Sequence, residues 1–255
     1  MTHAILTGHS RGLGAAVTAE LLARGVAVLG LSRSENPALA RAHPGQLEEV
    51  SIDLADGAAL AHWLDGGTLA RFVADADRVL LINNAGLLQP VGPLGSQDGA
   101  AIARALAVNV LAPLSLANAL VAARPAGRDC RILHVSSGAA RKAYAGWSVY
   151  GATKAALDQH ARAVAADALP GLRICSLAPG VLDTGMQAEV RASSPDRFPA
   201  RERFAALARD GQLVPPQDAA RRLVAHLLSE DFGREVVADL RELPPEAVDD
   251  ARAPR

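Results

Sequence analysis

The feature that most constrains the fold of this chain is the alternation of short apolar runs with alanine-rich stretches along nearly its whole length. This alternation is typical of a parallel sheet covered by helices, because each parallel strand needs a crossover before the next one. The runs are almost continuous in Val, Ile and Leu, as in strands that are buried on both faces. The pattern predicts strands at residues 3–7, 26–31, 48–52, 79–82, 131–135, 172–177 and 236–238. It predicts helices at residues 12–24, 56–75, 98–124, 150–168 and 217–229.

No internal repeat, low-complexity tract or linker divides the chain, so we predict a single domain over residues 1–243. Two regions depart from the alternation. Residues 183–213 contain Pro195, Pro199 and several charges, and we expect an irregular insertion there. Residues 244–255 are polar and contain proline, which is typical of a loose tail.

Composition excludes several classes of function. The 26 basic and 27 acidic side chains give a net charge of -1, which argues against a nucleic-acid partner. No run of apolar residues has the length that a membrane span needs, and no basic-then-apolar leader precedes the first strand. The seven histidines lack metal-ligand spacing. Cys175 falls inside a predicted strand and Cys130 directly before one, and we expect both to be free thiols. We therefore expect a cytoplasmic protein without metal, nucleic acid or membrane.

A glycine-rich loop follows the first predicted strand and opens the first helix. It reads TGHSRGLG over residues 7–14, with glycines spaced as G-x-x-x-G-x-G. Such glycines let the backbone turn sharply and bring the free N–H groups of a helix N-terminus against an anion. The loop therefore favours phosphate binding, although an ordinary strand-to-helix turn can also contain glycine.

The loop resembles the cofactor loop of the short-chain dehydrogenase/reductase family, and further motifs of that family follow in the same order. They are Asn83-Asn84-Ala85-Gly86, Asn109, Ser137, the Tyr150-x-x-x-Lys154 signature, and Pro179-Gly180 with Thr184 four residues after the glycine. The resemblance extends from residue 5 to about residue 240. It implies a three-layer α/β Rossmann fold, with a seven-stranded parallel sheet and a nicotinamide cofactor at the carboxyl ends of the strands.

The resemblance assigns cofactor binding to one set of residues. They are Gly8, Ser10, Arg11, Gly12, Leu13, Gly14, Arg33, Asp53, Leu54, Asn84, Ala85, Gly86, Tyr150, Lys154, Pro179, Gly180, Val181 and Thr184.

The choice of cofactor depends on the charges near the second strand. NAD enzymes place an acid there for the ribose hydroxyls, whereas NADP enzymes place a cation for the 2′-phosphate. This chain has Arg33 after the strand and Arg11 inside the loop, and a guanidinium donates two parallel hydrogen bonds to phosphate. We therefore expect NADP (NADPH), although either arginine alone is also compatible with an ordinary surface charge. Asp53 resembles the family residue at the adenine, and a turn or capping acid remains the alternative.

Tyr150 and Lys154 are four residues apart and share one face of a helix. A free phenol holds its proton too tightly for exchange at neutral pH, and a nearby ammonium is expected to lower its pKa. Ser137 is placed to donate to a substrate carbonyl, and its separation from Tyr150 favours it over Ser136. By resemblance, Lys154 also binds the nicotinamide ribose and Asn109 holds a water on the proton path.

The substrate side carries an unusual group of aromatic residues. Tyr144 and Trp147 stand close to Tyr150 in a chain with only 3% aromatic residues, which favours a flat apolar wall for aromatic carbonyl compounds. Packing of the loop or a subunit contact is the alternative interpretation of Tyr144 and Trp147.

The chain is also similar to the sepiapterin reductase-like branch and to bacterial benzil reductases that form (S)-benzoin. This resemblance implies NADPH-dependent reduction of a ketone or 1,2-dicarbonyl, with Met186 on a mobile lid at 185–210. It also implies Asp239 as a substrate anchor, for which an ordinary strand-end acid is equally compatible.

Two further classes of function remain open. One is an NADP-binding regulator without turnover, and the other is an alcohol dehydrogenase that works in the oxidative direction. The intact Ser137, Tyr150 and Lys154 set favours an enzyme, because a sensor needs no proton donor. The family commonly pairs the helices predicted at 98–124 and 150–168 across a two-fold axis, so a homodimer or homotetramer is expected.

Overall fold

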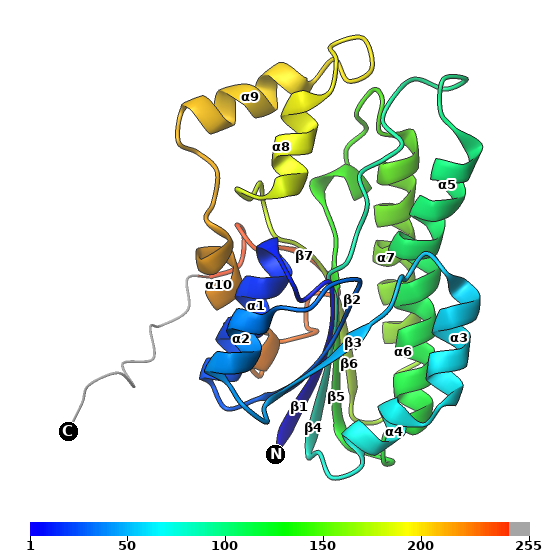
Figure 1. Ribbon diagram of the computed structural model, residues 1–255, viewed down its shortest axis with the longest axis vertical. Helices are drawn as coiled ribbons and strands as arrows, with labels where there is room; N and C mark the ends of the chain where they lie inside the picture. The colour runs from blue at the N-terminus through cyan, green and yellow to red at the C-terminus, as the bar shows by residue number, and fades with distance from the viewer. Residues whose placement is uncertain (245–255) are drawn as a thin grey trace, which may run out of the picture.

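One sheet of parallel strands runs through the molecule in the computed structural model, which describes residues 1–244 (Figure 1). Within those residues the strand order is β3-β2-β1-β4-β5-β6-β7, and each neighbouring pair is parallel. The seven-stranded parallel sheet expected from the sequence is therefore confirmed. Because the order of the strands reverses at β1 and β4, a crevice opens at their carboxyl ends. The strands are β1 (Thr2–Thr7), β2 (Ala27–Ser32), β3 (Leu47–Ser51), β4 (Arg78–Asn83), β5 (Asp129–Val135), β6 (Leu172–Ala178) and β7 (Val237–Asp239).

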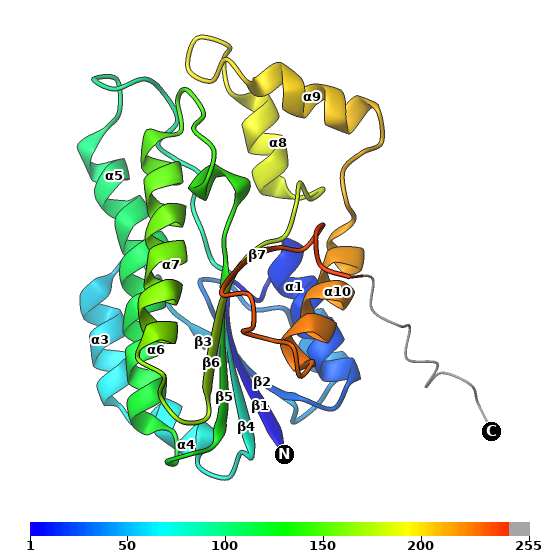
Figure 2. The same cartoon turned by 180° about the vertical axis from the view of Figure 1, so that it is seen from behind.

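Helices cover both faces of the sheet and complete the three layers (Figures 1 and 2). One face carries α1 (Gly12–Ala23), α2 (Pro37–Ala42) and α10 (Pro216–Leu228). The other face carries α3 (Gly57–Asp65), α4 (Thr68–Val73), α5 (Gly99–Leu106), the π-helical turn η1 (Ala107–Leu111), α6 (Ala112–Ala123) and α7 (Ser148–Ala166). Each layer buries its own apolar cluster against the sheet, and Leu21 and Leu223 lie in the first cluster and Leu60 and Leu120 in the second.

Two of the predicted helices are interrupted. The stretch at 56–75 divides into α3 and α4 at Gly67, whose φ of 72° is the left-handed conformation that ends a helix. The stretch at 98–124 widens into the η1 turn around Asn109. Pro113, four residues later, has no N–H to donate to the Asn109 carbonyl, which explains why regular α-helical bonding fails at this point.

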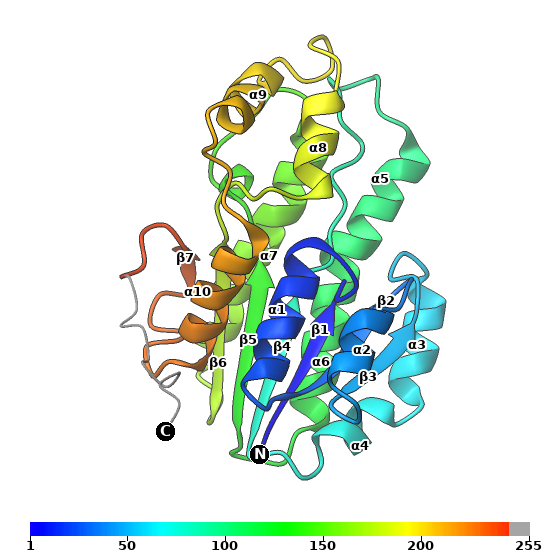
Figure 3. The same ribbon diagram turned by 60° about the vertical axis from the view of Figure 1, so that its left-hand side comes forward.

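The region predicted to be irregular, 183–213, contains two helices. They are α8 (Gly185–Ala192) and α9 (Arg201–Arg209), and they stand above the carboxyl ends of the strands (Figure 3). The prediction of an irregular insertion was therefore wrong. Pro195 and Pro199 lie in the connection between the two helices, where they interrupt neither of them.

The helix α2 was also missed, because its six residues are too short to show a helical period. Its start is nevertheless marked in the sequence. Asn36 caps it by accepting from the Leu39 N–H at 3.2 Å, and Pro37 occupies the first turn.

The two cysteines lie inside the protein as expected from the sequence. Cys130 and Cys175 are buried free thiols, and burial raises their pKa values to about 11 and about 12.

The stretch Gly99–Ala123 is long and apolar enough to cross a membrane by length and composition, but α6 packs on the sheet with Leu116 and Leu120 in the core. It is a core helix of this fold. The tail predicted at 244–255 lies, apart from Pro244, outside the described residues.

Candidate active site

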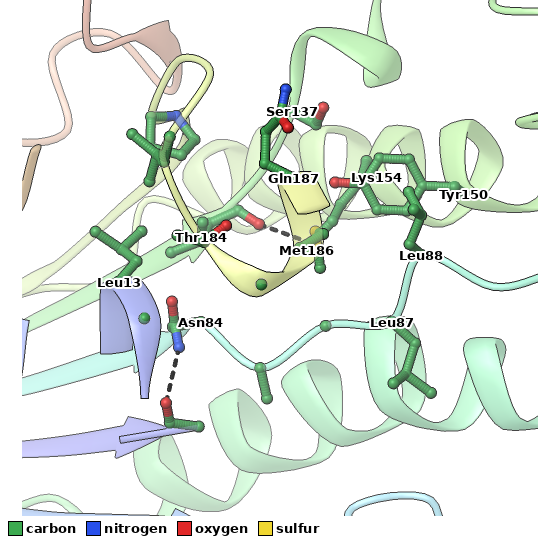
Figure 4. A pocket seen from close by; sticks show the side chains of 18 of the residues that line it. Leu13, Asn84, Leu87, Leu88, Ser137, Tyr150, Lys154, Thr184, Met186 and Gln187 are labelled. Carbon is green, nitrogen blue, oxygen red and sulfur yellow. Dashed lines mark hydrogen bonds between the residues drawn. The ribbon is translucent and has the colours of Figure 1, made fainter. Parts of the chain in front are cut away.

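A cavity of about 1050 Å³ lies at the carboxyl ends of the strands (Figure 4). We call one part of it the glycine-loop end, lined by Gly8, Gly12, Gly14, Arg33 and Asp53. We call the other part the aromatic end, lined by Tyr144, Trp147, Met186, Phe204 and Leu207. The walls include every residue assigned above to the cofactor or the substrate, and Asn109 is the one candidate site residue outside them.

The glycine-loop end is built by close backbone packing. Gly8 and Gly12 have positive φ angles of 72° and 56°, and a Cβ on Gly14 would lie 1.9 Å from the Gly8 carbonyl oxygen. The Asn84 side chain donates to the Thr7 carbonyl at 2.9 Å and the Gly8 carbonyl at 3.3 Å, which joins β1 to the loop after β4. These contacts leave room only for glycine and set the first turn of α1 against the cavity.

The charges of this end follow two patterns. Among residues 1–244, Arg11 and Arg33 form no ion pair with a carboxylate, and both side chains are exposed at the cavity. Asp53 instead accepts from the Ala55 N–H at 3.0 Å and pairs with Arg104 at 2.8 Å. The hydrogen bond from Ala55, followed by Arg104, holds the pKa of Asp53 below its usual value. Asp53 therefore lines the cavity as a turn-capping, ion-paired acid.

Tyr150 and Lys154 project from one face of α7 toward the middle of the cavity (Figure 4). Lys154 Nζ donates to the Val135 carbonyl at 2.9 Å and lies 5.8 Å from the centre of the Tyr150 ring. Burial lowers the pKa of Lys154 to about 8, while the Asp158 carboxylate acts in the opposite direction. Burial raises the pKa of Tyr150 and the Ser137 hydroxyl partly offsets it. The expectation of a lowered pKa at Tyr150 was therefore wrong, because loss of solvation dominates, and Tyr150 is held as the neutral phenol.

The two neighbouring serines face different surroundings. The Ser136 hydroxyl donates to Asp158 Oδ1 at 2.7 Å inside the protein. Ser137 Oγ accepts from the Ala139 N–H at 3.1 Å, which leaves the Ser137 hydroxyl proton for another acceptor. Both serines line the cavity, but only Ser137 keeps its hydroxyl proton free of an internal carboxylate.

At the aromatic end, rings pack against one another as well as against the cavity. Trp147 is 6% exposed, stacks on Phe198 with centroids 4.3 Å apart, and meets the Tyr150 ring edge-on at 5.4 Å. Tyr144 follows at 5.2 Å from Trp147, and Phe204 of α9 closes the group at 5.4 Å from Trp147. Trp147 is therefore both a packing residue and part of the cavity wall.

Comparison with known proteins assigns this arrangement to a family. Residues 2–195 match the short chain dehydrogenase family. The chain belongs to the short-chain dehydrogenase/reductase family. It is an oxidoreductase of that type.

Two relatives have lengths similar to that of this chain. The chain is 31% identical over 243 residues to the benzil reductase ((S)-benzoin forming) of Bacillus cereus, and the aligned region covers 91% of this chain and 96% of the relative. The chain is 34% identical over 242 residues to the sepiapterin reductase of Meriones unguiculatus, and the aligned region covers 89% of this chain and 92% of the relative. The resemblance to both branches is confirmed.

Solved structures agree with the fold. A short-chain dehydrogenase/reductase from Burkholderia vietnamiensis is 52% identical with a TM-score of 0.70, covering 95% of this chain and 98% of that one. A short chain dehydrogenase from Burkholderia cenocepacia J2315 in complex with NADP is 25% identical with a TM-score of 0.73, covering 92% and 94%.

Asn109 lies outside the cavity walls and holds the loop after β4. It is fully buried, its Oδ1 accepts from the Leu87 N–H at 2.7 Å, and its Nδ2 donates to the Leu87 carbonyl at 2.8 Å. The same amide donates to Thr153 Oγ1 at 3.1 Å. The Asn109 side chain is thus engaged with protein on both sides and fixes the loop after β4 to α7, and its water on the proton path stays a prediction.

Asp158 is a site residue that the sequence argument missed. It is 2% exposed, one turn after Lys154, and its Oδ1 also accepts from the Ser176 hydroxyl at 2.7 Å. Arg141 Nε lies 3.5 Å from its other oxygen. The signal was present in the sequence, because Tyr150, Lys154 and Asp158 continue the same four-residue spacing along one helix face.

Asp239 reaches the cavity, as the sequence suggested for a substrate anchor. Both of its carboxylate oxygens are engaged, however, by Arg241 Nε at 2.9 Å and Arg241 Nη2 at 2.6 Å. These hydrogen bonds hold the pKa of Asp239 below its usual value. The aspartate therefore enters the wall as half of an ion pair.

Proposed function

We propose that this enzyme uses NADPH to reduce a ketone or 1,2-dicarbonyl compound to the hydroxy compound. The observation that carries the proposal is the convergence of Ser137, Tyr150 and Lys154 on one cavity that continues to the glycine loop. The printed activities of the benzil and sepiapterin reductase relatives support carbonyl reduction as the reaction class.

The residues of the glycine-loop end fit a dinucleotide. The first helix, α1, has no side-chain hydrogen bond at its N-cap, so its first N–H groups remain for a pyrophosphate. Arg11 and Arg33 stand beside the same cavity without an acidic partner among residues 1–244, and an additional phosphate would satisfy both. Thr184 caps α8 with no side-chain bond to the helix, so its hydroxyl is free for the nicotinamide carboxamide. The NADP complex of the Burkholderia cenocepacia relative supports the same choice.

The chain's own groups divide the work of reduction. The Ser137 hydroxyl donates to the substrate carbonyl oxygen and polarises it as negative charge develops there. Tyr150 donates its proton to that oxygen, and the Lys154 ammonium stabilises the phenolate that is left behind. When bound, the nicotinamide supplies the hydride. We propose further that the 185–210 segment, with Met186, closes over the site and excludes water.

The printed activities of the relatives favour the reductive direction over oxidation of an alcohol. A regulator without turnover would need no proton donor beside the cofactor.

Consumption of NADPH and of NADH, each with benzil, diacetyl and sepiapterin, tests the proposal. We expect turnover with NADPH, and Tyr150→Phe is expected to lower kcat by roughly a thousandfold while NADPH still binds. Ser137→Ala should act in the same direction, and Ser136→Ala serves as the matched control with a much smaller effect on kcat. Near-normal turnover by Tyr150→Phe would refute its role as the proton donor.

We also propose a cytoplasmic homodimer, or a homotetramer built from it. Leu106 and Leu111 are 47% and 50% exposed on the α5–η1 stretch, where a two-fold contact with another copy would cover them. The free thiols Cys130 and Cys175 are compatible with a reducing compartment. Sedimentation velocity checks the assembly, and a monomer that persists at all concentrations would refute it.

A further inference from the structure

Two cations surround the phenol of Tyr144 at the aromatic end of the cavity. Arg203 Nη1 lies 3.4 Å from Tyr144 Oη, and Lys142 Nζ lies 5.7 Å from the centre of the Tyr144 ring. All three residues line the cavity. A guanidinium can only donate, so the Tyr144 oxygen accepts from Arg203 and its own O–H remains to donate elsewhere. The three groups therefore all offer donors to a bound molecule.

The other charged groups of this end have partners of their own. Arg241 is engaged with Asp239, and Arg141 lies 3.5 Å from Asp158. Glu189, also in the wall, keeps its negative charge and accepts a hydrogen bond from Gln89 at 2.8 Å. Within residues 1–244, neither Lys142 nor Arg203 forms an ion pair with a carboxylate.

Tyr144, Lys142 and Arg203 form a donor group that lies on the far side of Trp147 from Tyr150. The Trp147 ring stands between it and the site of reduction, 5.4 Å from the Tyr150 ring and 5.2 Å from the Tyr144 ring. A flat substrate that lies along this wall with its carbonyl at Tyr150 extends toward Tyr144, Lys142 and Arg203.

We infer that the preferred substrates carry a carboxylate at the end remote from the carbonyl that is reduced. The inference rests on the proposed function and narrows it from aryl ketones and dicarbonyls in general to anionic ones. A carboxylate fits the site because its two oxygens accept from the Arg203 fork, the Lys142 ammonium and the Tyr144 hydroxyl together.

A matched pair of substrates tests the inference, namely benzil and benzil that bears one para-carboxylate. The quantity compared is the ratio of kcat/KM for the carboxylated compound to kcat/KM for benzil, measured with NADPH at low salt. We expect a ratio of roughly ten in the unaltered enzyme, which decreases as ionic strength increases. Lys142→Gln and Arg203→Gln remove the charge and keep a polar side chain, and each is expected to lower the ratio severalfold. Arg209→Gln is the control, because Arg209 lies on the same helix but pairs with Glu202 at 2.8 Å outside the cavity walls.

Each outcome decides one question. A ratio near one in the unaltered enzyme, with benzil still reduced, overturns the inference and leaves the proposed function standing. An equal loss in Arg209→Gln and Arg203→Gln also overturns it, because the effect would then be general charge. If neither compound is reduced, the proposed function fails, and calorimetric titration of both compounds into the protein with NADP⁺ decides the inference. The inference is supported if the carboxylated compound binds more tightly than benzil and Arg203→Gln abolishes this difference. Equal binding of the two compounds overturns the inference.

Discussion

The glycine-loop end and the aromatic end of the cavity are held together in different ways. At the first, backbone meets backbone, and the space at Gly14 admits no Cβ beside the Gly8 carbonyl. At the second, side chains from distant segments meet, with Trp147 before α7 stacked on Phe198 between α8 and α9. A substitution at the aromatic end therefore changes a contact surface, whereas one at the glycine loop changes the path of the chain. The fold can keep its cofactor site constant while its substrate wall varies.

The largest effect that separates the two ends is expected from adding one methyl group to a glycine in each. Gly14→Ala should lower the free energy of unfolding by roughly 3 kcal/mol or more, since the new Cβ would stand 1.9 Å from a backbone oxygen that cannot move alone. Gly185→Ala is the matched control at the start of α8, where no atom lies within 4 Å of the added group. Urea denaturation of the two variants measures the difference. Equal stability would show that the loop tolerates side chains and that the contrast between the ends is wrong.

The same contrast explains what the sequence could predict. The strands and the glycine loop depend on local patterns, and each appeared close to where it was expected. The aromatic end depends on contacts between segments some fifty residues apart, such as Trp147 with Phe198, which no local period reveals. Asn109 shows the same limit, because the residue was recognised but its bonds to Leu87 come from another element. Pairing of Asp239 with Arg241 was equally invisible, since two charges near each other in sequence do not reveal where they point.

A second prediction tests which cofactor the glycine-loop end selects. Arg33→Ala should weaken NADPH binding by roughly 1–3 kcal/mol, the free energy of a lost charge-assisted hydrogen bond, and should leave NADH binding nearly unchanged. Arg41→Ala is the control, because that exposed arginine of α2 lies outside the cavity walls. Fluorescence titration with both cofactors measures the constants. Equal weakening for NADPH and NADH would remove Arg33 from the 2′-phosphate.

A third prediction concerns Asp158, which is buried one turn after Lys154. Burial already lowers the pKa of Lys154 to about 8, and Asp158 opposes that shift. Asp158→Asn keeps an oxygen for the hydroxyls of Ser136 and Ser176 but removes the negative charge, so the pKa of Lys154 should fall further. Lys154 carries its positive charge only below its pKa. In Asp158→Asn, kcat/KM should therefore start to fall at a pH roughly one unit lower than in the unaltered enzyme. Asp167→Asn, at the C-cap of the same helix, is the control, and an unshifted pH profile in Asp158→Asn would contradict the coupling.

The smallest expected effect comes from the wall itself. Trp147→Phe keeps a ring to stack on Phe198 but shortens the apolar surface between Tyr150 and Tyr144. The indole Nε1 has no hydrogen-bond partner among the described residues, so its removal leaves no partner unsatisfied and the fold should be retained. We expect KM for benzil to rise about threefold, which corresponds to the loss of roughly 25 Å² of apolar contact at about 25 cal/mol per Å². Diacetyl has no ring to lie on the wall, so its KM should hardly change, and NADPH affinity should stay the same. If KM for benzil and diacetyl increase equally, Trp147 acts only through packing of the 185–210 segment, and substrate selection at the aromatic end has to come from its charges.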